Sequence, residues 1–187
     1  IEKGEMGGEC LNTGCVPSKA LIASAAVAQA MREAARFGVR PVEPRVEWTE
    51  VRKRVKRTIA AIAPIDSQAR YEAMGVRVIR ARARFANPHT VEAGGVAIRA
   101  RRFVIATGSS PAIPRIPGLE SVRALTNETV FDLDVLPHRL IVIGGGPVGV
   151  ELAQAFRRLG SEAVILEAGT CLSREDPELA RVALDRL

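Results

Sequence analysis

Two cysteines near the start of the chain, Cys10 and Cys15, lie in the segment Gly-Gly-Glu-Cys-Leu-Asn-Thr-Gly-Cys-Val-Pro-Ser-Lys that ends at Lys19. Four residues separate the thiols, and a glycine among them lets the backbone turn and close a small ring. Pro17 predicts that a helix begins at or just after Cys15. The helix dipole and Lys19 would then stabilise the thiolate form of Cys15. A stabilised thiolate beside a second thiol is typical of reversible thiol–disulfide exchange.

A metal site is the main alternative for the same pair. Such a site would need about two further ligands. The remaining candidates are Cys171, His89 and His138, and none of them stands at a paired spacing. Three cysteines also do not form the framework of a small secreted disulfide protein. The pattern therefore favours a redox pair in a cytoplasmic protein, with no metal ligands, and Cys171 is expected to be an ordinary packed residue.

A second segment that carries chemistry, Gly-Gly-Gly-Pro-Val-Gly from position 144 to 149, fits the pattern G-x-G-x-x-G. It follows the apolar run 140–143 and opens a helical pattern. Gly144 would permit the tight turn, Gly146 would let the backbone approach a pyrophosphate, and Gly149 would let helix and strand pack closely.

The helix after this turn indicates which ligand the turn binds. Its free N–H groups and positive dipole end would face a phosphate, with Pro147 and Val148 at the helix start. Glu167, at the end of the next apolar run, would accept a hydrogen bond from a ribose 2′-hydroxyl and repel a 2′-phosphate. This favours NADH over NADPH, although Arg174 lies close enough in sequence to complicate the preference. A glycine-rich turn that packs without a ligand is the alternative.

The composition excludes several classes of protein. The chain has 187 residues, of which 47 % are hydrophobic, so it can bury a core of one to one and a half domains. A net charge of +6 would suit a polyanion, but only 4 % of the residues are aromatic and no recognition motif accompanies the charge, so no nucleic-acid partner is expected. The longest apolar stretch, 20–31, falls short of the ~20 residues that span a bilayer, and no membrane partner is expected.

The elements that must position these residues alternate between helical and strand patterns. We expect helices over 17–37 and over 48–74, the second interrupted at Pro64. Strand patterns follow over 76–80, 81–85, 90–93, 96–99 and 103–106, with Gly-Gly at 94–95 as a hairpin turn. A strand–helix–strand unit is predicted over 140–143, 147–159 and 163–166, and an amphipathic helical pattern over 178–187. The sequence therefore predicts an α/β fold with a domain boundary close to Pro137.

The cysteine segment resembles the redox-active disulfide signature of the class I pyridine nucleotide-disulfide oxidoreductases. These flavoproteins include dihydrolipoamide dehydrogenase, glutathione reductase and mercuric reductase. The segment Ala-Thr-Gly-Ser-Ser-Pro at 106–111 resembles the family's strand-to-loop segment beside FAD, and the Gly144 turn stands where the family has its NAD(P) motif. The resemblance implies two Rossmann-like dinucleotide-binding domains, both incomplete here. Residues 1–137 would be part of an FAD domain with a β-meander, and 138–187 the start of an inserted NAD(P) domain.

The resemblance also implies roles for individual residues. Cys10 would be the thiol that attacks the substrate, and Cys15 the charge-transfer thiol against the flavin. Lys19 would point toward the flavin N5 region and pair with Glu151. The remaining FAD contacts would come from Glu2, which would hold the adenosine ribose, and from Lys3, Gly8, Ala83, Thr107, Gly108 and Ser109.

The implied activity is an electron relay from NAD(P)H through FAD to the cysteine pair. The final acceptor would be a small disulfide, a lipoyl group or Hg(II), and the protein would be a cytoplasmic homodimer. The segments 62–67 and 126–132, together with Phe85, favour bacterial members similar to mercuric reductase. Neither His89 nor His138 suits the family's catalytic base, which would lie in a C-terminal domain. The alternative is a nucleotide-binding module without catalysis, or an inactive fragment.

Overall fold

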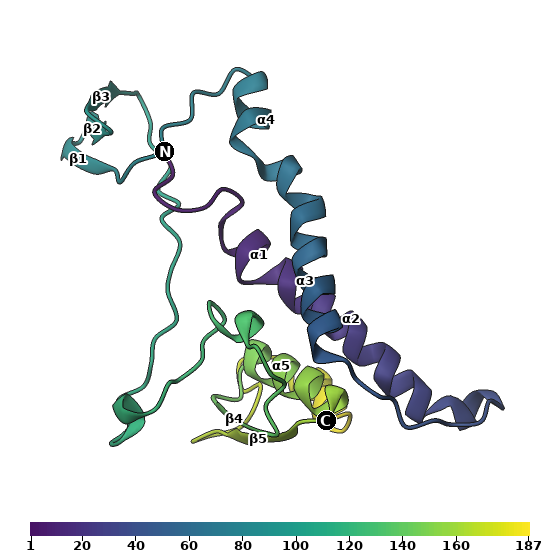
Figure 1. Ribbon diagram of the computed structural model, residues 1–187. Helices are drawn as coiled ribbons and strands as arrows, with labels where there is room; N and C mark the ends of the chain where they lie inside the picture. The colour runs from purple at the N-terminus through teal and green to yellow at the C-terminus, as the bar shows by residue number, and fades with distance from the viewer. The chain divides into compact units, whose positions relative to one another are not determined.

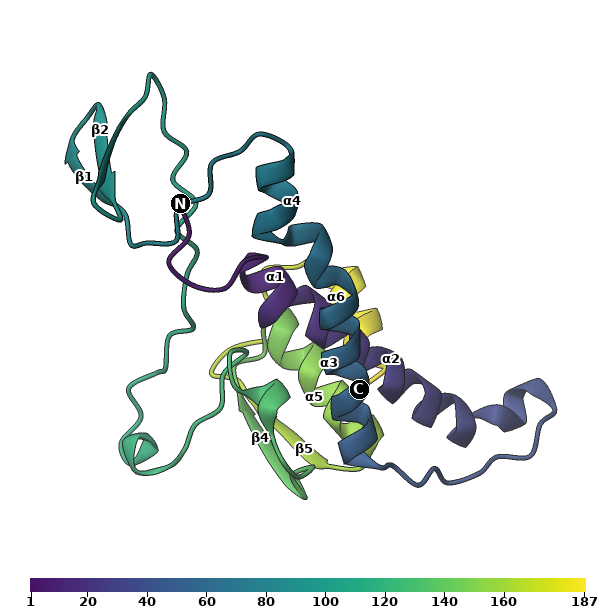
Figure 2. The same cartoon turned by 45° about the horizontal axis from the view of Figure 1, so that its top comes forward.

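A computed structural model describes residues 1–187 of the chain. The chain forms two compact units, and each is described by itself. The first unit comprises residues 1–17 and 56–131, and the second comprises 18–55 and 132–187. Figures 1 and 2 show the helices and strands of both units from two directions. The predicted domains 1–137 and 138–187 remain a prediction about the family's domain organisation.

The predicted helices of the first 75 residues are confirmed. They are observed as α2 (Cys15–Arg32), the 3-10 turn η1 (Ala34–Phe37), α3 (Trp48–Ile62), η2 (Ala63–Asp66) and α4 (Gln68–Ala73). The break expected at Pro64 is the turn η2, because proline has no N–H to continue the helical hydrogen bonds. The short helix α1 (Gly8–Asn12) was not predicted. The side chain of Leu11 in this helix is buried. This packing stabilises a helix that is too short to be stable alone.

The first unit contains a three-stranded antiparallel sheet in the order β1 (Arg84–Asn87), β2 (Thr90–Ala93) and β3 (Val96–Arg99). The predicted hairpin is confirmed, with Ala93 paired to Val96 across the Gly-Gly turn. Both turn glycines have positive φ, 56° and 75°, which a two-residue hairpin turn of this hand requires. Val91 and Ala93 are buried while Glu92 is exposed, as the alternation along a half-buried strand predicts.

The strands predicted over 76–80 and 103–106 were wrong. Residues 76–79 are irregular, and Arg80 forms only an isolated parallel bridge with Glu2. Residues 103–106 are extended but unpaired, with Val104 92 % and Ile105 71 % exposed. The strand predicted over 81–85 begins only at Arg84. β-branched residues favour extended backbone, but a strand also needs a hydrogen-bonded neighbour, and no strand of residues 1–187 pairs with these segments.

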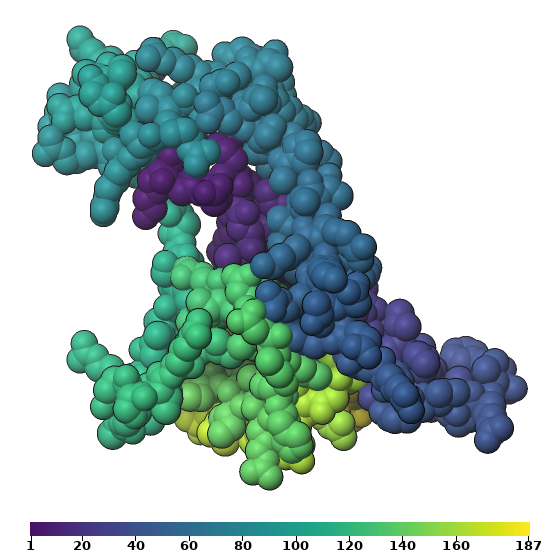
Figure 3. All heavy atoms as spheres, in the orientation of Figure 1, coloured from purple at the N-terminus to yellow at the C-terminus, as the bar shows by residue number.

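The second unit contains the predicted strand–helix–strand arrangement. Strands β4 (Arg139–Ile143) and β5 (Glu162–Leu166) pair in parallel, and α5 (Pro147–Leu159) connects them. One face of α5 is buried at spacings of three and four residues, and Phe156 on that face is fully buried. In the space-filling view the atoms of residues 132–187, green to yellow, form one packed body (Figure 3).

Trp48 of α3 completes the packing around α5. Its ring lies 5.7 Å from the ring of Phe156 between centroids, and its indole N–H donates to the carbonyl oxygen of Leu133 at 2.8 Å. A helix α6 (Pro177–Leu184) follows β5, capped by the carboxylate of Asp176. No helix in the chain combines the length and apolarity needed to cross a bilayer.

Candidate functional site: a disulfide and a dinucleotide turn

The structure joins Cys10 and Cys15 in a disulfide, with their Cα atoms 4.5 Å apart. Cys10 lies on α1, and Cys15 is the first residue of α2, as Pro17 indicated. Both cysteines are exposed, so an external thiol or metal ion can reach the sulfur atoms. A Cβ on Gly14 would lie 3.1 Å from the Glu9 carbonyl oxygen, so the tight ring between the cysteines favours glycine there.

Two side-chain amides connect the ring to its surroundings, one from within the ring and one from a distant turn. Asn12 Nδ2 donates to the carbonyl oxygens of Met6 at 3.0 Å and Gly8 at 2.9 Å. These bonds hold the backbone before α1 against its first turn. Asn127, which lies 117 positions after Cys10, also donates to this segment. The sequence indicated neither amide as a site residue, because the chemistry predicted for the motif came from its two thiols and Lys19. Within residues 1–187, no cluster of three or more His, Cys, Asp or Glu side chains has metal-binding geometry.

Lys19 lies on α2 four residues after Cys15, and its ammonium forms an ion pair with Oε1 of Glu151 on α5. The two residues are 132 positions apart in sequence, and the structure brings them together. Both side chains keep access to solvent, so the pair adds little to stability. The ion pair holds the positive charge of Lys19 at a fixed position near the start of α2.

The turn between β4 and α5 uses its three motif glycines in three different ways. Gly144 has φ +108°, in the left-handed region that favours glycine. A Cβ on Gly149 would overlap the carbonyl oxygen of Gly144 and lie 3.2 Å from Cγ1 of Val142. Gly146 caps α5 without any side-chain cap, and a Cβ there would meet nothing within 4 Å.

This open space at Gly146 lies over the N-terminus of α5. The helix there has unpaired N–H groups and a positive dipole end, and no side chain covers them. Pro147, in the first turn, has no N–H to leave unsatisfied, and Val148 follows it with an exposed side chain. The residues present therefore fit a pyrophosphate: a backbone cradle with a positive end and no side chain in the way.

Glu167 follows β5 and lies against the same turn. Its Oε2 accepts the N–H of Gly145 at 2.7 Å, and its Oε1 accepts the N–H of Gly169 at 3.0 Å. These hydrogen bonds, that from Gly145 first, hold the pKa of the Glu167 carboxyl below its ordinary value. The carboxylate is therefore ionised at neutral pH, and its remaining lone pairs suit ribose hydroxyl donors.

Cys171 is a free, half-buried thiol, consistent with its prediction as a packed residue. Its sulfur occupies the space that a Cβ on Gly145 would need. The N–H of Leu172 donates to the carbonyl oxygen of Gly145 at 2.8 Å. Both polar groups of the Gly145 peptide are thus bound by residues that follow β5, which makes the turn rigid before any ligand binds.

The residues predicted to contact FAD, other than Lys19, lie in the first unit. The N–H of Glu2 donates to the carbonyl oxygen of Ile79 at 3.0 Å, and the N–H of Ala81 donates to that of Glu2 at 3.1 Å. Oε1 of Glu2 accepts the N–H of Gly4 at 2.6 Å, so Oε2 remains for a ribose hydroxyl. This acid at the end of a bridged segment fits the ribose. The other predicted contacts lie on exposed backbone: Lys3, Gly8, Ala83, Thr107, Gly108 and Ser109.

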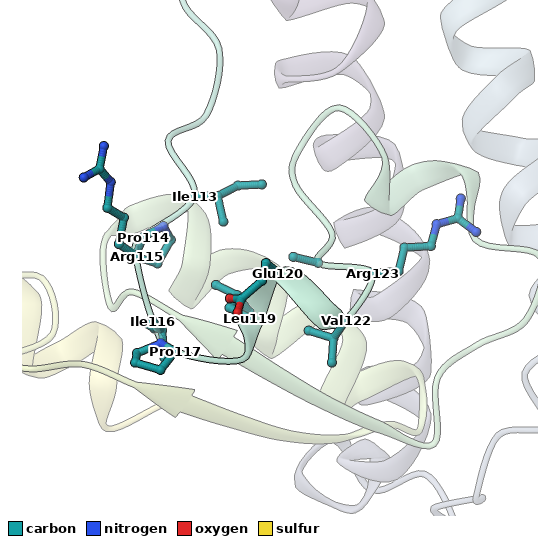
Figure 4. A pocket seen from close by; sticks show the side chains of 10 residues that line it. Ile113, Pro114, Arg115, Ile116, Pro117, Leu119, Glu120, Val122 and Arg123 are labelled. Carbon is teal, nitrogen blue, oxygen red and sulfur yellow. The ribbon is translucent and has the colours of Figure 1, made fainter.

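A separate hollow of about 730 Å³ is formed within residues 113–124. Figure 4 shows Pro114, Ile116 and Pro117 on the segment that enters it, and Val122 and Arg123 on the segment that leaves it. The lining contains no thiol, no glycine-rich turn and none of the predicted site residues. The predicted cysteines and the glycine-rich turn therefore lie outside this hollow.

The chain thus combines an exposed disulfide at a helix start with a parallel strand–helix–strand unit whose turn fits a pyrophosphate, the two features expected of a pyridine nucleotide-disulfide oxidoreductase. The comparisons agree: residues 1–187 match the family model described as "Pyridine nucleotide-disulphide oxidoreductase". The chain belongs to this family. Membership implies the use of FAD and a pyridine nucleotide.

Individual relatives are consistent with this assignment. The chain is 38 % identical to a mercuric reductase of Streptomyces lividans, over 96 % of this chain and 39 % of that protein. It is 37 % identical to a mercuric reductase of Acidithiobacillus ferrooxidans, over 96 % of this chain and 34 % of that protein. The chain thus spans at most about two fifths of the length of these relatives.

A solved structure confirms the fold class. The HOCl-induced flavoprotein disulfide reductase RclA from Escherichia coli, solved as a Cu(II) complex, has a TM-score of 0.79 and 26 % identity, covering 100 % of this chain and 41 % of that one. The α/β flavoprotein fold predicted from the sequence is therefore confirmed. The relatives are oxidoreductases, and the alternative of a nucleotide-binding module without catalysis is not favoured.

Proposed function

We propose that the protein is an oxidoreductase that passes electrons from NADH to the Cys10–Cys15 disulfide and from the resulting thiolates to Hg(II). The observation that carries the proposal is the exposed disulfide between Cys10 and Cys15, the first residue of α2. Mercuric reductases among the relatives support Hg(II) as the acceptor. A small disulfide is the second candidate, supported by the flavoprotein disulfide reductase of similar fold.

The two sulfur atoms perform the final steps. Two electrons break the S–S bond and leave thiolates on Cys10 and Cys15. Thiolates are soft ligands and bind Hg(II). In the net reaction Hg(II) gains two electrons and leaves as Hg(0), and the S–S bond forms again. FAD, when bound, supplies the two-electron chemistry between nicotinamide and disulfide.

Other residues bind and orient. The backbone at Gly146 and the start of α5 would hold the NADH pyrophosphate, with Pro147 and Val148 in the first turn. Glu167, ionised, would accept the ribose 2′-hydroxyl and repel the 2′-phosphate of NADPH. Lys19, paired to Glu151, would supply a fixed positive charge beside the flavin.

The remaining FAD contacts are proposed for Glu2 at the ribose and for the backbone that follows the extended segment 103–106, which carries Thr107, Gly108 and Ser109. We also propose a homodimer in the cytoplasm, where reducing conditions keep a cycling thiol pair from permanent oxidation.

The test uses the protein in its natural full length, loaded with FAD. NADH oxidation is followed on addition of Hg(II) in excess small thiol, and separately with glutathione disulfide and with lipoamide. We expect Hg(II)-dependent turnover in the wild type. Cys10→Ser should abolish turnover while NADH still bleaches the flavin absorbance. Turnover that persists in Cys10→Ser would exclude the disulfide as the relay, and turnover with glutathione disulfide alone would replace Hg(II) by the second candidate.

A further inference from the structure

The turn at 126–129, of sequence Thr-Asn-Glu-Thr, satisfies its own backbone. The N–H of Thr126 donates to Oγ1 of Thr129 at 3.0 Å, and the N–H of Glu128 donates to Oγ1 of Thr126 at 3.2 Å. The N–H groups of Thr129 and Val130 donate to the carbonyl oxygen of Thr126 at 3.0 and 2.9 Å. Such hydroxyl-bonded turns have a defined backbone geometry. The half-buried side chain of Asn127 takes no part in these bonds and is held at a fixed position.

That side chain contacts the redox segment at two points. Asn127 Nδ2 donates to Oε1 of Glu9 at 3.3 Å and lies 3.5 Å from the carbonyl oxygen of Thr13. Glu9 directly precedes Cys10, and Thr13 stands two positions before Cys15. The N–H of Thr13 also donates to the carbonyl oxygen of Glu9 at 2.9 Å. One amide therefore spans the two ends of the ring that the disulfide closes.

This contact matters most when the disulfide is reduced. Once the S–S bond is broken, the backbone between the cysteines is free to separate the two sulfur atoms, and the disulfide becomes entropically harder to form again. A donor that holds both ends of the segment opposes this separation. Asparagine suits the position, because its NH₂ group can donate to a carboxylate and a carbonyl together. Aspartate has no donor and would place a second negative charge beside Glu9.

We propose that Asn127 is a positioning residue that keeps Cys10 and Cys15 within bonding reach in the dithiol state, and so sets how readily their disulfide forms again. The proposal rests on the redox function proposed above for this pair. Asn127 itself does not contact the reacting sulfur atoms. It acts through Glu9 and Thr13, so its removal should change the redox equilibrium rather than abolish the chemistry.

The equilibrium between the protein disulfide and dithiothreitol measures this directly. One reduced dithiothreitol gives two electrons and two protons to the Cys10–Cys15 bond, which yields two protein thiols and the cyclic dithiothreitol disulfide. The protein in its full length is equilibrated at a series of reduced-to-oxidised dithiothreitol ratios, quenched with acid and alkylated. Mass spectrometry of the peptide that carries both cysteines then gives the fraction reduced, without any need for NADH or turnover.

Asn127→Asp should shift the equilibrium about fivefold toward the dithiol, the size expected for one lost hydrogen bond of ordinary strength at a partly exposed site. The double variant Glu9→Gln/Asn127→Asp restores a donor–acceptor pair with the roles exchanged, and it should return to within about twofold of the wild type. Glu128→Gln is the matched control, because it changes an exposed charge in the same turn that forms no side-chain bond, and it should leave the equilibrium unchanged. Thermal unfolding of each variant separates a redox effect from a loss of folding, and Asn127→Ser replaces Asn127→Asp if the latter does not fold.

An unchanged equilibrium in Asn127→Asp, or a double variant that shifts as far as the single one, would overturn the positioning role. A different measurement tests the redox function proposed for Cys10 and Cys15. If NADH cannot reduce the wild-type disulfide in the FAD-loaded protein, the relay is wrong even where the dithiothreitol equilibrium responds to Asn127. If NADH reduces it and Asn127→Asp has no effect, only the positioning role is wrong.

Discussion

Gly146 and Gly149 stand three positions apart in the dinucleotide turn, and alanine at each should give opposite results. At Gly149 the added Cβ would overlap the Gly144 carbonyl oxygen, with Val142 Cγ1 at 3.2 Å. Neither backbone nor strand can move far, because β4 pairs with β5 over its whole length. Overpacking of a tight contact costs about 1–3 kcal/mol. Gly149→Ala should therefore lower the free energy of unfolding by that amount.

At Gly146 the added Cβ meets nothing within 4 Å, and the residue has φ −73° and ψ 173°, which alanine adopts freely. Stability should be unchanged or should rise by up to about 1 kcal/mol, because alanine reduces the freedom of the unfolded chain. The methyl group would nevertheless occupy the space into which a pyrophosphate must come. NADH binding should weaken by about tenfold or more, since close backbone approach is the purpose of glycine there.

The assay pairs urea unfolding, followed by the fluorescence of Trp48, with the KM for NADH in the full-length enzyme. Gly146→Ala should move only the KM, and Gly149→Ala should move the unfolding midpoint. Destabilisation by Gly146→Ala as large as that by Gly149→Ala would refute the separate roles of the two glycines, and so would a Gly146→Ala enzyme that binds NADH as tightly as the wild type.

Further predictions concern Glu167, Phe156 and the ion pair on α5. The pKa of Glu167 is lowered by the fold, so its stabilising contribution should be present above the ordinary carboxyl pKa and be lost as the pH falls through the lowered value. The difference in unfolding midpoint between the wild type and Glu167→Gln should therefore shrink on acidification. A constant difference from pH 7 to 3 would contradict this. Glu167→Gln should also narrow the preference for NADH over NADPH, measured as the ratio of kcat/KM values. Phe156→Ala should cost about 3–5 kcal/mol in urea unfolding, whereas Val164→Ala on the exposed face of β5 should cost well under half of that. Glu151→Gln should change the unfolding midpoint little, because the pair with Lys19 is exposed, but it should alter the spectrum of the bound flavin if Lys19 supplies a charge there.

Local patterns were enough to predict the strand–helix–strand unit and the hairpin. In both, the turn glycines and the apolar periodicity act over fewer than thirty residues, and the structure reproduces the predicted bounds within one residue at β4, β5 and the hairpin. The strand predicted over 103–106 failed for the opposite reason. Its apolar, β-branched residues are as suitable as those of β4, but a strand forms only beside a partner, and the partner is not encoded in the segment itself.

The residues of the candidate site also differ in whether the reason for their role lies within a short segment of sequence. The thiols and the motif glycines could be predicted because each motif carries its own physical reason within a few residues. The pair Lys19–Glu151 was reached only through the family resemblance, since charge on two distant helices has no pairing rule in sequence. Asn127 was not predicted as a site residue. Asparagine is common in polar turns, and only the structure shows that the Asn127 amide donates a hydrogen bond to Glu9.

The disulfide ring and the dinucleotide turn are held by different kinds of groups, and each should therefore respond differently to substitution. The dinucleotide turn is made of backbone: both polar groups of Gly145 are bound, and the space at Gly146 is open because side chains are absent. Apart from a change to the Glu167 carboxylate, which accepts the Gly145 N–H, only a change that adds atoms to the turn can alter it. The disulfide ring is held instead by the side-chain amides Asn12 and Asn127. A single amide exchange can loosen that ring without disturbing a helix or a sheet. Nucleotide affinity should therefore change in large steps at few positions, whereas the redox equilibrium of the disulfide should be adjustable in small steps through these amides.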